Sequence, residues 1–221
     1  MIPPTHDGEY VARMEDVLAV YQRPPDPAAP VLCMDEKPVQ LVQETRPPVP
    51  AAPGRPTRVD YEYERAGTAS LFMFNEPHTG WRQVCAKARR TKVDWAGEMR
   101  ALLDGRYADV PKVVLVMDNL NTHTLGAFYT AFPPAEARRL VERLEVHWTP
   151  KHGSWLNIAE NELSALTTQC LSRRIGTLRA LQREVNAWAT SRNAGRVRVR
   201  WRFTIDRARE KLGRVYPQIQ S

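Results

Sequence analysis

Two short runs of apolar residues, each followed by an aspartate, constrain the fold of this chain most strongly. The run Val113–Met117 contains no polar residue and precedes Asp118, and the run Val31–Met34 precedes Asp35. Wholly apolar runs of this length are typical of strands that are covered on both faces of a sheet. The sequence therefore predicts an α/β protein in which two buried strands each carry a carboxylate near their end.

Helical and strand-like segments alternate along the rest of the chain. The predicted helices cover residues 8–22, 92–104, 134–144, 177–193 and 204–214, and the other predicted strands cover 68–74, 81–88 and 145–149. The proline-rich residues 37–66 are expected to form a loop. Gly153 and Ser154 are expected to form the turn and N-cap of a further helix that starts near Trp155. Together these elements predict a mixed five-stranded sheet flanked by helices.

The length and the cysteines indicate the class of protein. A chain of 221 residues suits one α/β domain with appendages. Cys33, Cys85 and Cys170 lie far apart in apolar contexts, which is typical of reduced cysteines in a cytoplasmic protein. No segment approaches the roughly 18 apolar residues of a membrane span, and the first residues do not resemble a secretion signal. We therefore expect a cytoplasmic protein with no membrane partner.

The chain is basic, and its positive charge is concentrated near the C-terminus. The net charge is +7 and the pI is about 9.6. Residues 173–214 contain twelve arginines and one lysine against three acidic residues, which leaves a net charge of +10 in this segment. Nucleic acid is the expected partner of such a segment. A solvated, arginine-rich helical surface would give the same pattern.

The two aspartates need a physical explanation because burying an unpaired charge is costly. Each alone could cap the following turn or helix. Together with an acidic residue in the helix near Trp155, they supply the oxygen ligands that Mg²⁺ prefers. Two such ions, roughly 3.5 to 4 Å apart, can promote cleavage of a phosphodiester. Helical geometry places Glu160 and Glu162 on the two flanks of an apolar stripe, so either could be the third carboxylate.

Three motifs resemble one known family. The segments VLCMDEK, VVLVMDNLNTHT and HWTPKHGSWLNIAENELSALTTQCLSRR together resemble the catalytic core of DDE transposases of the mariner superfamily, specifically its bacterial insertion-sequence branch. The resemblance covers about residues 30–216. Asp35 and Asp118 match the first two acidic residues of that family, and Glu160 matches the third. The resemblance implies a ribonuclease-H-like fold whose first and fourth strands carry the aspartates and whose late helix carries the glutamate.

The resemblance also implies an activity, its cofactors and its partners. It implies a metal-dependent DNA endonuclease and strand transferase, which cuts DNA at transposon ends and joins the released 3′-hydroxyl to target DNA. Asp35 would bridge two Mg²⁺ ions, with Mn²⁺ as a substitute, and Asp118 and Glu160 would each complete one site. The implied assembly is a homodimer in a paired-end complex. The implied location is the bacterial cytoplasm, associated with the nucleoid when DNA is bound.

The resemblance suggests a division of the chain. We expect an N-terminal helix and proline-rich linker over residues 1–29, a ribonuclease-H-like DDE core over 30–175 and a basic helical extension over 176–221. Such transposases carry helix-turn-helix units before the catalytic domain, and these do not fit into the 34 residues before Asp35. A separate helix-turn-helix subunit is therefore an expected partner, and this chain alone is expected to bind DNA weakly and with strong salt dependence.

Further residues near the motifs are candidates for DNA contact. They are Asn119, Asn121, His123, Lys151, His152, Ser154, Trp155, Arg173 and Arg174. Hydrogen bonds within the local turn are an alternative role for the first three, and core packing is an alternative for the tryptophan. Two other functions also remain open for the chain. One is a cellular nuclease or resolvase of the same fold, and the other is a non-catalytic DNA-binding remnant of a mobile element.

Overall fold

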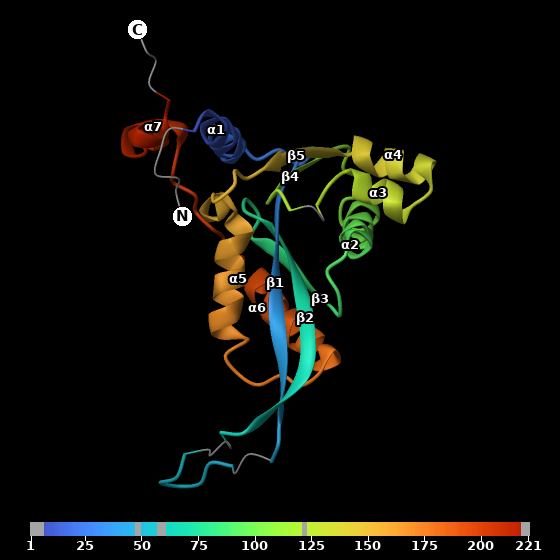
Figure 1. Cartoon of the computed structure of the whole chain (residues 1–221), viewed down its shortest axis with the longest axis vertical. Coiled ribbons are helices and arrows are strands. Elements are labelled where there is room, and N and C mark those ends of the chain that lie inside the picture. The colour runs from blue at the N-terminus through green and yellow to red at the C-terminus, as the bar shows by residue number, and fades with distance from the viewer. Residues whose placement is uncertain (1–6, 47–49, 57–60, 121–122, 218–221) are drawn as a thin grey trace.

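The computed structural model describes residues 7–46, 50–56, 61–120 and 123–217. Helices and strands follow the predicted order (Figure 1). The strands are β1 (Val31–Glu44), β2 (Tyr63–Glu76), β3 (Trp81–Lys87), β4 (Val113–Met117) and β5 (Leu144–Trp148). The α-helices are α1 (Gly8–Gln22), α2 (Lys92–Asp104), α3 (Gly126–Ala131), α4 (Pro134–Glu142), α5 (Ile158–Gln169), α6 (Leu178–Ala194) and α7 (Ile205–Lys211), and two 3₁₀ turns cover Ser154–Leu156 and Gly213–Val215.

The five strands form one mixed sheet, as the sequence predicts. Their order is β3-β2-β1-β4-β5. The pairs β1–β2 and β2–β3 are antiparallel, whereas β4 runs parallel to both β1 and β5. The two apolar runs found in the sequence are therefore neighbouring parallel strands at the centre of the sheet.

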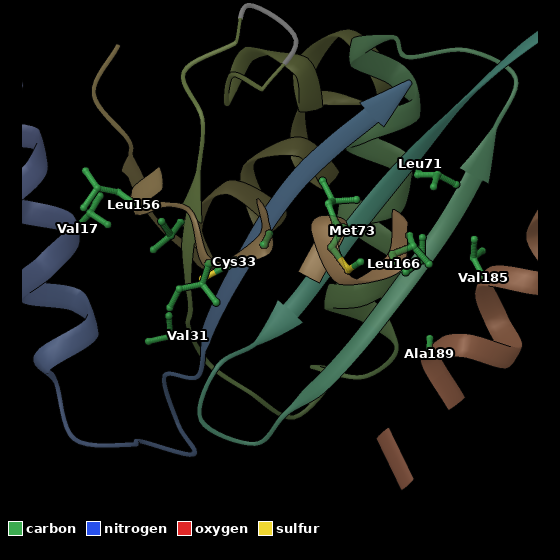
Figure 2. Packing of buried hydrophobic residues seen from close by; sticks show 14 of the residues in the cluster. Val17, Val31, Cys33, Leu71, Met73, Leu156, Leu166, Val185 and Ala189 are labelled. Atoms are coloured by element: carbon green, nitrogen blue, oxygen red, sulfur yellow. The ribbon is translucent and has the colours of Figure 1, made fainter. Parts of the chain in front are cut away.

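Helices cover both faces of this sheet. Residues of α1, α5, α6 and α7 share one buried cluster, which Figure 2 shows with Val17 from α1, Cys33 from β1, Leu166 from α5 and Val185 from α6. Residues of α2, α3 and α4 belong to a second cluster on the opposite face. All five residues of β4 are buried because they alternate between the two clusters.

The proline-rich residues 37–66 were expected to form a loop, and this expectation was wrong at both ends, where β1 extends to Glu44 and β2 begins at Tyr63. β1 pairs with β2 from Cys33 to Glu44, so the two strands form a long hairpin (Figure 1). β4 pairs with β1 only over Val31–Cys33. Beyond that point β1 has a strand on one side only, and a proline such as Pro38 is tolerated in such an edge.

The start of α5 also differs from the expectation. Ser154 begins a 3₁₀ turn, and the N-cap of α5 is Asn157, whose Oδ1 accepts a hydrogen bond from the backbone N–H of Ala159 at 3.1 Å. The short helix α3 was not predicted from the sequence. Thr204 caps α7 as predicted, by accepting a hydrogen bond from the Arg207 N–H. In the described parts of the chain, no helix has both the length and the apolar character needed to cross a bilayer.

Candidate active site

The first two predicted carboxylates lie side by side because their strands are neighbours. Cys33 of β1 is paired with Val116 of β4, so the register places Asp35 level with Asp118 two residues further on. Asp35 lies within β1 and is half-buried, while Asp118 directly follows β4 with 28 % of its side chain exposed. The pairing of β1 with β4 therefore brings the backbones of these two residues level with each other.

The third carboxylate is brought to the same place by the cap of α5. Asn157 is 1 % exposed, and its Nδ2 donates a hydrogen bond of 2.8 Å to the carbonyl of Met34, the residue before Asp35. Because the same side chain caps α5, it ties the first turn of that helix to β1. Glu160 is an exposed residue of this turn. Asn157 was not singled out from the sequence, although an asparagine three residues before a glutamate is the spacing of a capping box.

Asp35 and Glu160 line one groove between β1 and α5. Its volume is about 470 Å³. The lining residues are Asp35, Glu36, Lys37, Pro38, Glu160, Leu163, Ser164, Thr167 and Thr168. We refer to it below as the acidic groove. It contains three carboxylates and one lysine, so negative charge prevails in it.

The electrostatics of the acidic groove show in the carboxyl group of Asp35. Burial raises the pKa of Asp35 to about 7, and the negative charges of Asp118 and Glu160 add to this effect. The backbone N–H of Glu36, which donates to Asp35 Oδ1 at 2.7 Å, and the nearby His123 act in the opposite direction without cancelling it. A neighbouring cation would favour the ionised form of such a carboxyl.

His123 is a buried link between two carboxylates. Its Nδ1 lies 2.7 Å from Asp118 Oδ1, and its Nε2 lies 2.7 Å from Glu36 Oε1. Burial lowers the pKa of His123, but these two carboxylates outweigh that effect and raise the pKa to about 9. Arg90 Nε lies 3.2 Å from the other oxygen of Glu36. The side chain of His123 is 0 % exposed, so it supports Asp118 from behind and is not available to contact DNA.

The donor chemistry of the groove suits a divalent metal ion. Asp35, Glu160 and the neighbouring Asp118 supply only oxygen ligands, and the pKa of Asp35 is raised first by burial and then by the negative charges of the other two. Within the residues that the structure describes, no three His, Cys, Asp or Glu side chains are grouped closely enough to form an assembled metal site. Asp35, Asp118 and Glu160 are the residues that could hold a metal ion here.

Comparison with known proteins identifies the family. A model of the DDE superfamily endonuclease family matches residues 30–182, which is more than half of the chain. The chain belongs to this family. The match contains Asp35, Asp118 and Glu160, and it extends into α6.

Solved structures share the fold of this DDE endonuclease. The Mos1 mariner paired-end complex with Mn superposes with a TM-score of 0.55 at 18% identity, over 86% of this chain and 58% of that chain. The Mos1 strand transfer complex gives 0.56 at 16% identity, over 86% and 57%. The mariner Mos1 paired-end complex with Mg gives 0.54 at 16% identity, over 99% and 66%. No curated protein sequence matches the chain.

These similarities confirm the predicted fold. The DDE endonuclease has a ribonuclease-H-like fold, in which the first and fourth strands and a late helix carry the acidic residues that the sequence motifs identified. The chain spans between 57% and 66% of the length of these three Mos1 chains.

Glu162, the alternative third carboxylate, faces away from the acidic groove of the DDE endonuclease. It is 2 % exposed and lies 2.8 Å from Arg82 Nε and 3.0 Å from Arg192 Nη2. Arg82 is itself 0 % exposed. This buried cluster joins α5 to β3 and α6. Helix periodicity alone left Glu160 and Glu162 equivalent, because it does not reveal which flank meets an arginine from another element.

The remaining predicted residues are spread around the domain. Asn119 and the exposed Lys151 line a small hollow beside α1, and His152 and Ser154 are exposed nearby. Trp155 is half-buried, donates to Tyr10 Oη at 3.1 Å and stacks on Trp201 with ring centroids 6.4 Å apart. Arg173 pairs with Glu184, and Arg174 pairs with Glu44 at the distal part of the hairpin. Asn121 lies outside the described residues.

Proposed function

We propose that this chain is the catalytic domain of a mariner-type DDE transposase, which cleaves DNA at transposon ends and transfers the cut strand into target DNA. The observation that carries this proposal is the position of Asp35. The register of the sheet places it level with Asp118, and the N-cap of α5 keeps Glu160 close to it. Membership of the DDE endonuclease family supports the same chemistry. The bacterial insertion-sequence branch, suggested by the motifs, is part of the proposal.

The three carboxylates have distinct proposed roles. Asp35 would be shared between two divalent ions, and Asp118 and Glu160 would each complete one of the two sites. When bound, Mg²⁺ or Mn²⁺ would activate the attacking oxygen and stabilise the leaving oxygen of the phosphodiester. Asp35 must lose its proton before it can act as a ligand. Because its pKa is raised to about 7, protons would compete with the metal ion for this carboxylate near neutral pH.

Two other residues would position these ligands. His123 holds Asp118 Oδ1 through a hydrogen bond and is itself held by Glu36. Asn157 holds the first turn of α5 against β1 and so keeps Glu160 beside Asp35. Neither residue would touch DNA. Each would act by keeping a carboxylate in place, as partners of metal ligands commonly do.

Partners follow from the structures that this fold resembles. Those structures are described as Mos1 paired-end and strand transfer complexes, and they include one with Mn and one with Mg. By analogy, this chain would bind transposon ends and target DNA as a homodimer, and a helix-turn-helix subunit is a further proposed partner. It would work in the cytoplasm, associated with the nucleoid. The division into residues 1–29, 30–175 and 176–221 remains part of the proposal.

Nicking of supercoiled or end-bearing DNA in the presence of Mg²⁺ or Mn²⁺ tests this function. The parent is compared with Asp118→Asn and with Asp109→Asn, which makes the same chemical change at an exposed aspartate outside the acidic groove. We expect cleavage by the parent and by Asp109→Asn, and none by Asp118→Asn. Equal cleavage by the parent and Asp118→Asn would contradict the catalytic assignment. No cleavage by any of the three would favour a DNA-binding remnant.

A further inference from the structure

The segment between α6 and α7 has an alternating sequence that the proposed chemistry does not use. Residues 195–204 read GRVRVRWRFT, so that arginines alternate with apolar residues. The arginines, which we call the arginine row, are Arg196, Arg198, Arg200 and Arg202, and all four are exposed. Val199, Trp201 and Phe203 pack against the core instead. From Arg198 to Phe203, exposed arginines therefore alternate with residues that pack on the core, as in an extended backbone, whereas Arg196 has a left-handed φ of 46° and Val197 is exposed.

The backbone of the arginine row is held firmly against the domain. Arg82 donates a side-chain hydrogen bond to the carbonyl of Val197. Gly80, in the turn between β2 and β3, has a φ of +75°, and a Cβ at this position would lie 2.8 Å from the same carbonyl oxygen. At the other end of the segment, the Ile205 N–H donates to Gln22 Oε1 at 3.1 Å. The row is thus anchored at both ends.

An aromatic cluster supports the middle of the row. The ring of Trp201 lies 5.2 Å from that of Tyr21 and stacks on Trp155, and its Nε1 donates to the carbonyl of Phe203 at 2.8 Å. Phe203 also meets Trp155 edge to face at 5.4 Å. These contacts fix the apolar side of the segment. The arginines on the other side are therefore presented from a rigid base.

The arginine row carries charges that no carboxylate neutralises in the described part of the chain. Elsewhere in the basic C-terminal region, Arg173, Arg174, Arg192 and Arg209 each pair with a glutamate. None of the four arginines of the row has a carboxylate partner among the residues that the structure describes. The row therefore contributes four arginines without a described carboxylate partner to the positive charge near the C-terminus.

Three arginines of the row line a groove of about 640 Å³. The lining residues are Tyr21, Pro77, His78, Ile158, Arg196, Arg198, Val199, Arg200 and Trp201. We call it the basic groove, since none of these described lining residues is acidic. Ile158 belongs to the first turn of α5, two residues before Glu160 of the acidic groove. Each groove therefore has one lining residue in the first turn of α5.

We propose that the arginine row binds the phosphate backbone of duplex DNA and holds it next to the acidic groove. Alternate residues of an extended chain are roughly 6.6 Å apart, so Arg198, Arg200 and Arg202 present a line of positive charges and not a single convergent anion site. A line of charges suits a polyanion with regularly repeated phosphates, and guanidinium groups can bind each phosphate with two hydrogen bonds. This inference rests on the proposed function only in naming DNA as the polyanion.

Binding of a fluorescent 30-base-pair duplex, measured by anisotropy in EDTA over a range of salt concentrations, tests the proposal. The variant R198Q/R200Q removes two charges from the basic groove. The control R179Q/R207Q removes two exposed arginines of the same C-terminal region that lie outside the groove. Equal thermal midpoints for both variants and the parent establish that each is folded. R198K/R200K keeps the charge and serves as a second check.

We expect R198Q/R200Q to bind at least about 10-fold more weakly at moderate salt and to lower the slope of log affinity against log salt by roughly 2. R179Q/R207Q should stay within about 2-fold of the parent, and R198K/R200K should keep most of the affinity. Equal losses in R198Q/R200Q and R179Q/R207Q would overturn the proposal, because total charge would then explain binding. In a competition assay, poly-glutamate and unlabelled DNA are compared at equal concentrations of negative charge. Equal displacement of the labelled duplex by both would also overturn the proposal.

This experiment separates the two proposals. It contains no divalent metal, so it measures binding independently of cleavage. Failure of the parent to cleave DNA would contradict the proposed function and leave the binding result standing. Loss of the difference between R198Q/R200Q and R179Q/R207Q would contradict the role of the arginine row and leave the cleavage result standing.

Discussion

The acidic and basic grooves are each lined by a residue of the first turn of α5, yet they hold their charges in opposite ways. In the acidic groove the carboxyl of Asp35 is half-buried beside other negative charges, and its pKa is raised to about 7. In the basic groove the arginines are exposed, so that water solvates their charges. The acidic groove therefore carries an electrostatic cost that a bound cation would relieve, whereas the basic groove needs no ligand to be stable.

Their supports differ as well. The acidic groove is backed by buried polar contacts, from His123 behind Asp118 and from Asn157 between α5 and β1. The basic groove is formed by an extended segment on an aromatic base. Changes in the first region should therefore alter chemistry or stability sharply, and changes in the second should alter DNA affinity gradually.

The largest contrast is expected between two glutamates of the same helix. Glu160→Gln should abolish metal-dependent cleavage without loss of stability, because this side chain is exposed and would be needed only as a ligand. Glu162→Gln should lower the free energy of unfolding by about 3 to 5 kcal/mol, since it leaves Arg82 and Arg192 without their buried carboxylate. Nicking assays and urea denaturation measure the two effects. Loss of cleavage in Glu162→Gln without loss of stability, together with normal cleavage by Glu160→Gln, would instead make Glu162 the third carboxylate.

A smaller effect is expected from the histidine behind Asp118. His123→Gln should reduce cleavage by about 10- to 100-fold and raise the Mn²⁺ concentration needed for half-maximal rate, because Asp118 loses its support. His147→Gln is a matched control, since His147 also lies between two carboxylates, Asp16 and Glu145, outside both grooves. A metal requirement unchanged by His123→Gln would show that His123 does not position Asp118.

The electrostatic cost of the acidic groove predicts a stabilising substitution. The raised pKa of Asp35 means that its contribution to stability is complete below its unfolded value of about 3.8 and is lost as the pH rises through about 7. Asp35→Asn should therefore raise the free energy of unfolding of the metal-free protein at pH 7.5 by about 1 to 3 kcal/mol. Mn²⁺ should raise the thermal midpoint of the parent and much less that of the variant. A variant less stable than the parent without metal would contradict this reasoning.

The smallest effect is expected below the arginine row. Trp155→Phe removes the hydrogen bond to Tyr10 and part of the stack on Trp201, so the free energy of unfolding should fall by about 1 kcal/mol. DNA affinity should stay within about 2-fold of the parent. A loss of affinity above about 10-fold with unchanged stability would instead indicate that Trp155 stacks on a base.

Much of the fold was predictable because its signals are local. The apolar run Val113–Met117 marked a strand buried on both faces, and helical spacing located α1 and α2 with their observed bounds. The length of β1 was not predictable in the same way. Its outer part is stabilised by pairing with β2, and the prolines in this region concealed a contact that is distant in sequence.

The candidate site was predictable to a similar degree. Asp35 and Asp118 follow apolar runs and are visible in the sequence, whereas the choice between Glu160 and Glu162 depends on Arg82 and Arg192, which come from other elements. The supporting roles of His123 and Asn157 also depend on partners distant in sequence, Glu36 and Met34. The alternation in the arginine row was present in the sequence, but only the structure shows that these arginines lack carboxylate partners in the described part of the chain.

We propose that the acidic groove holds the metal and that the basic groove holds the DNA. To test this division, duplex binding is measured in EDTA, and nicking is then measured after addition of Mn²⁺, in the parent, Asp118→Asn and R198Q/R200Q. We predict that Asp118→Asn binds the duplex at least as tightly as the parent but does not nick it, and that R198Q/R200Q binds at least about 10-fold more weakly. Nicking by Asp118→Asn at the parent rate, or parent-like binding by R198Q/R200Q, would contradict this division between the two grooves.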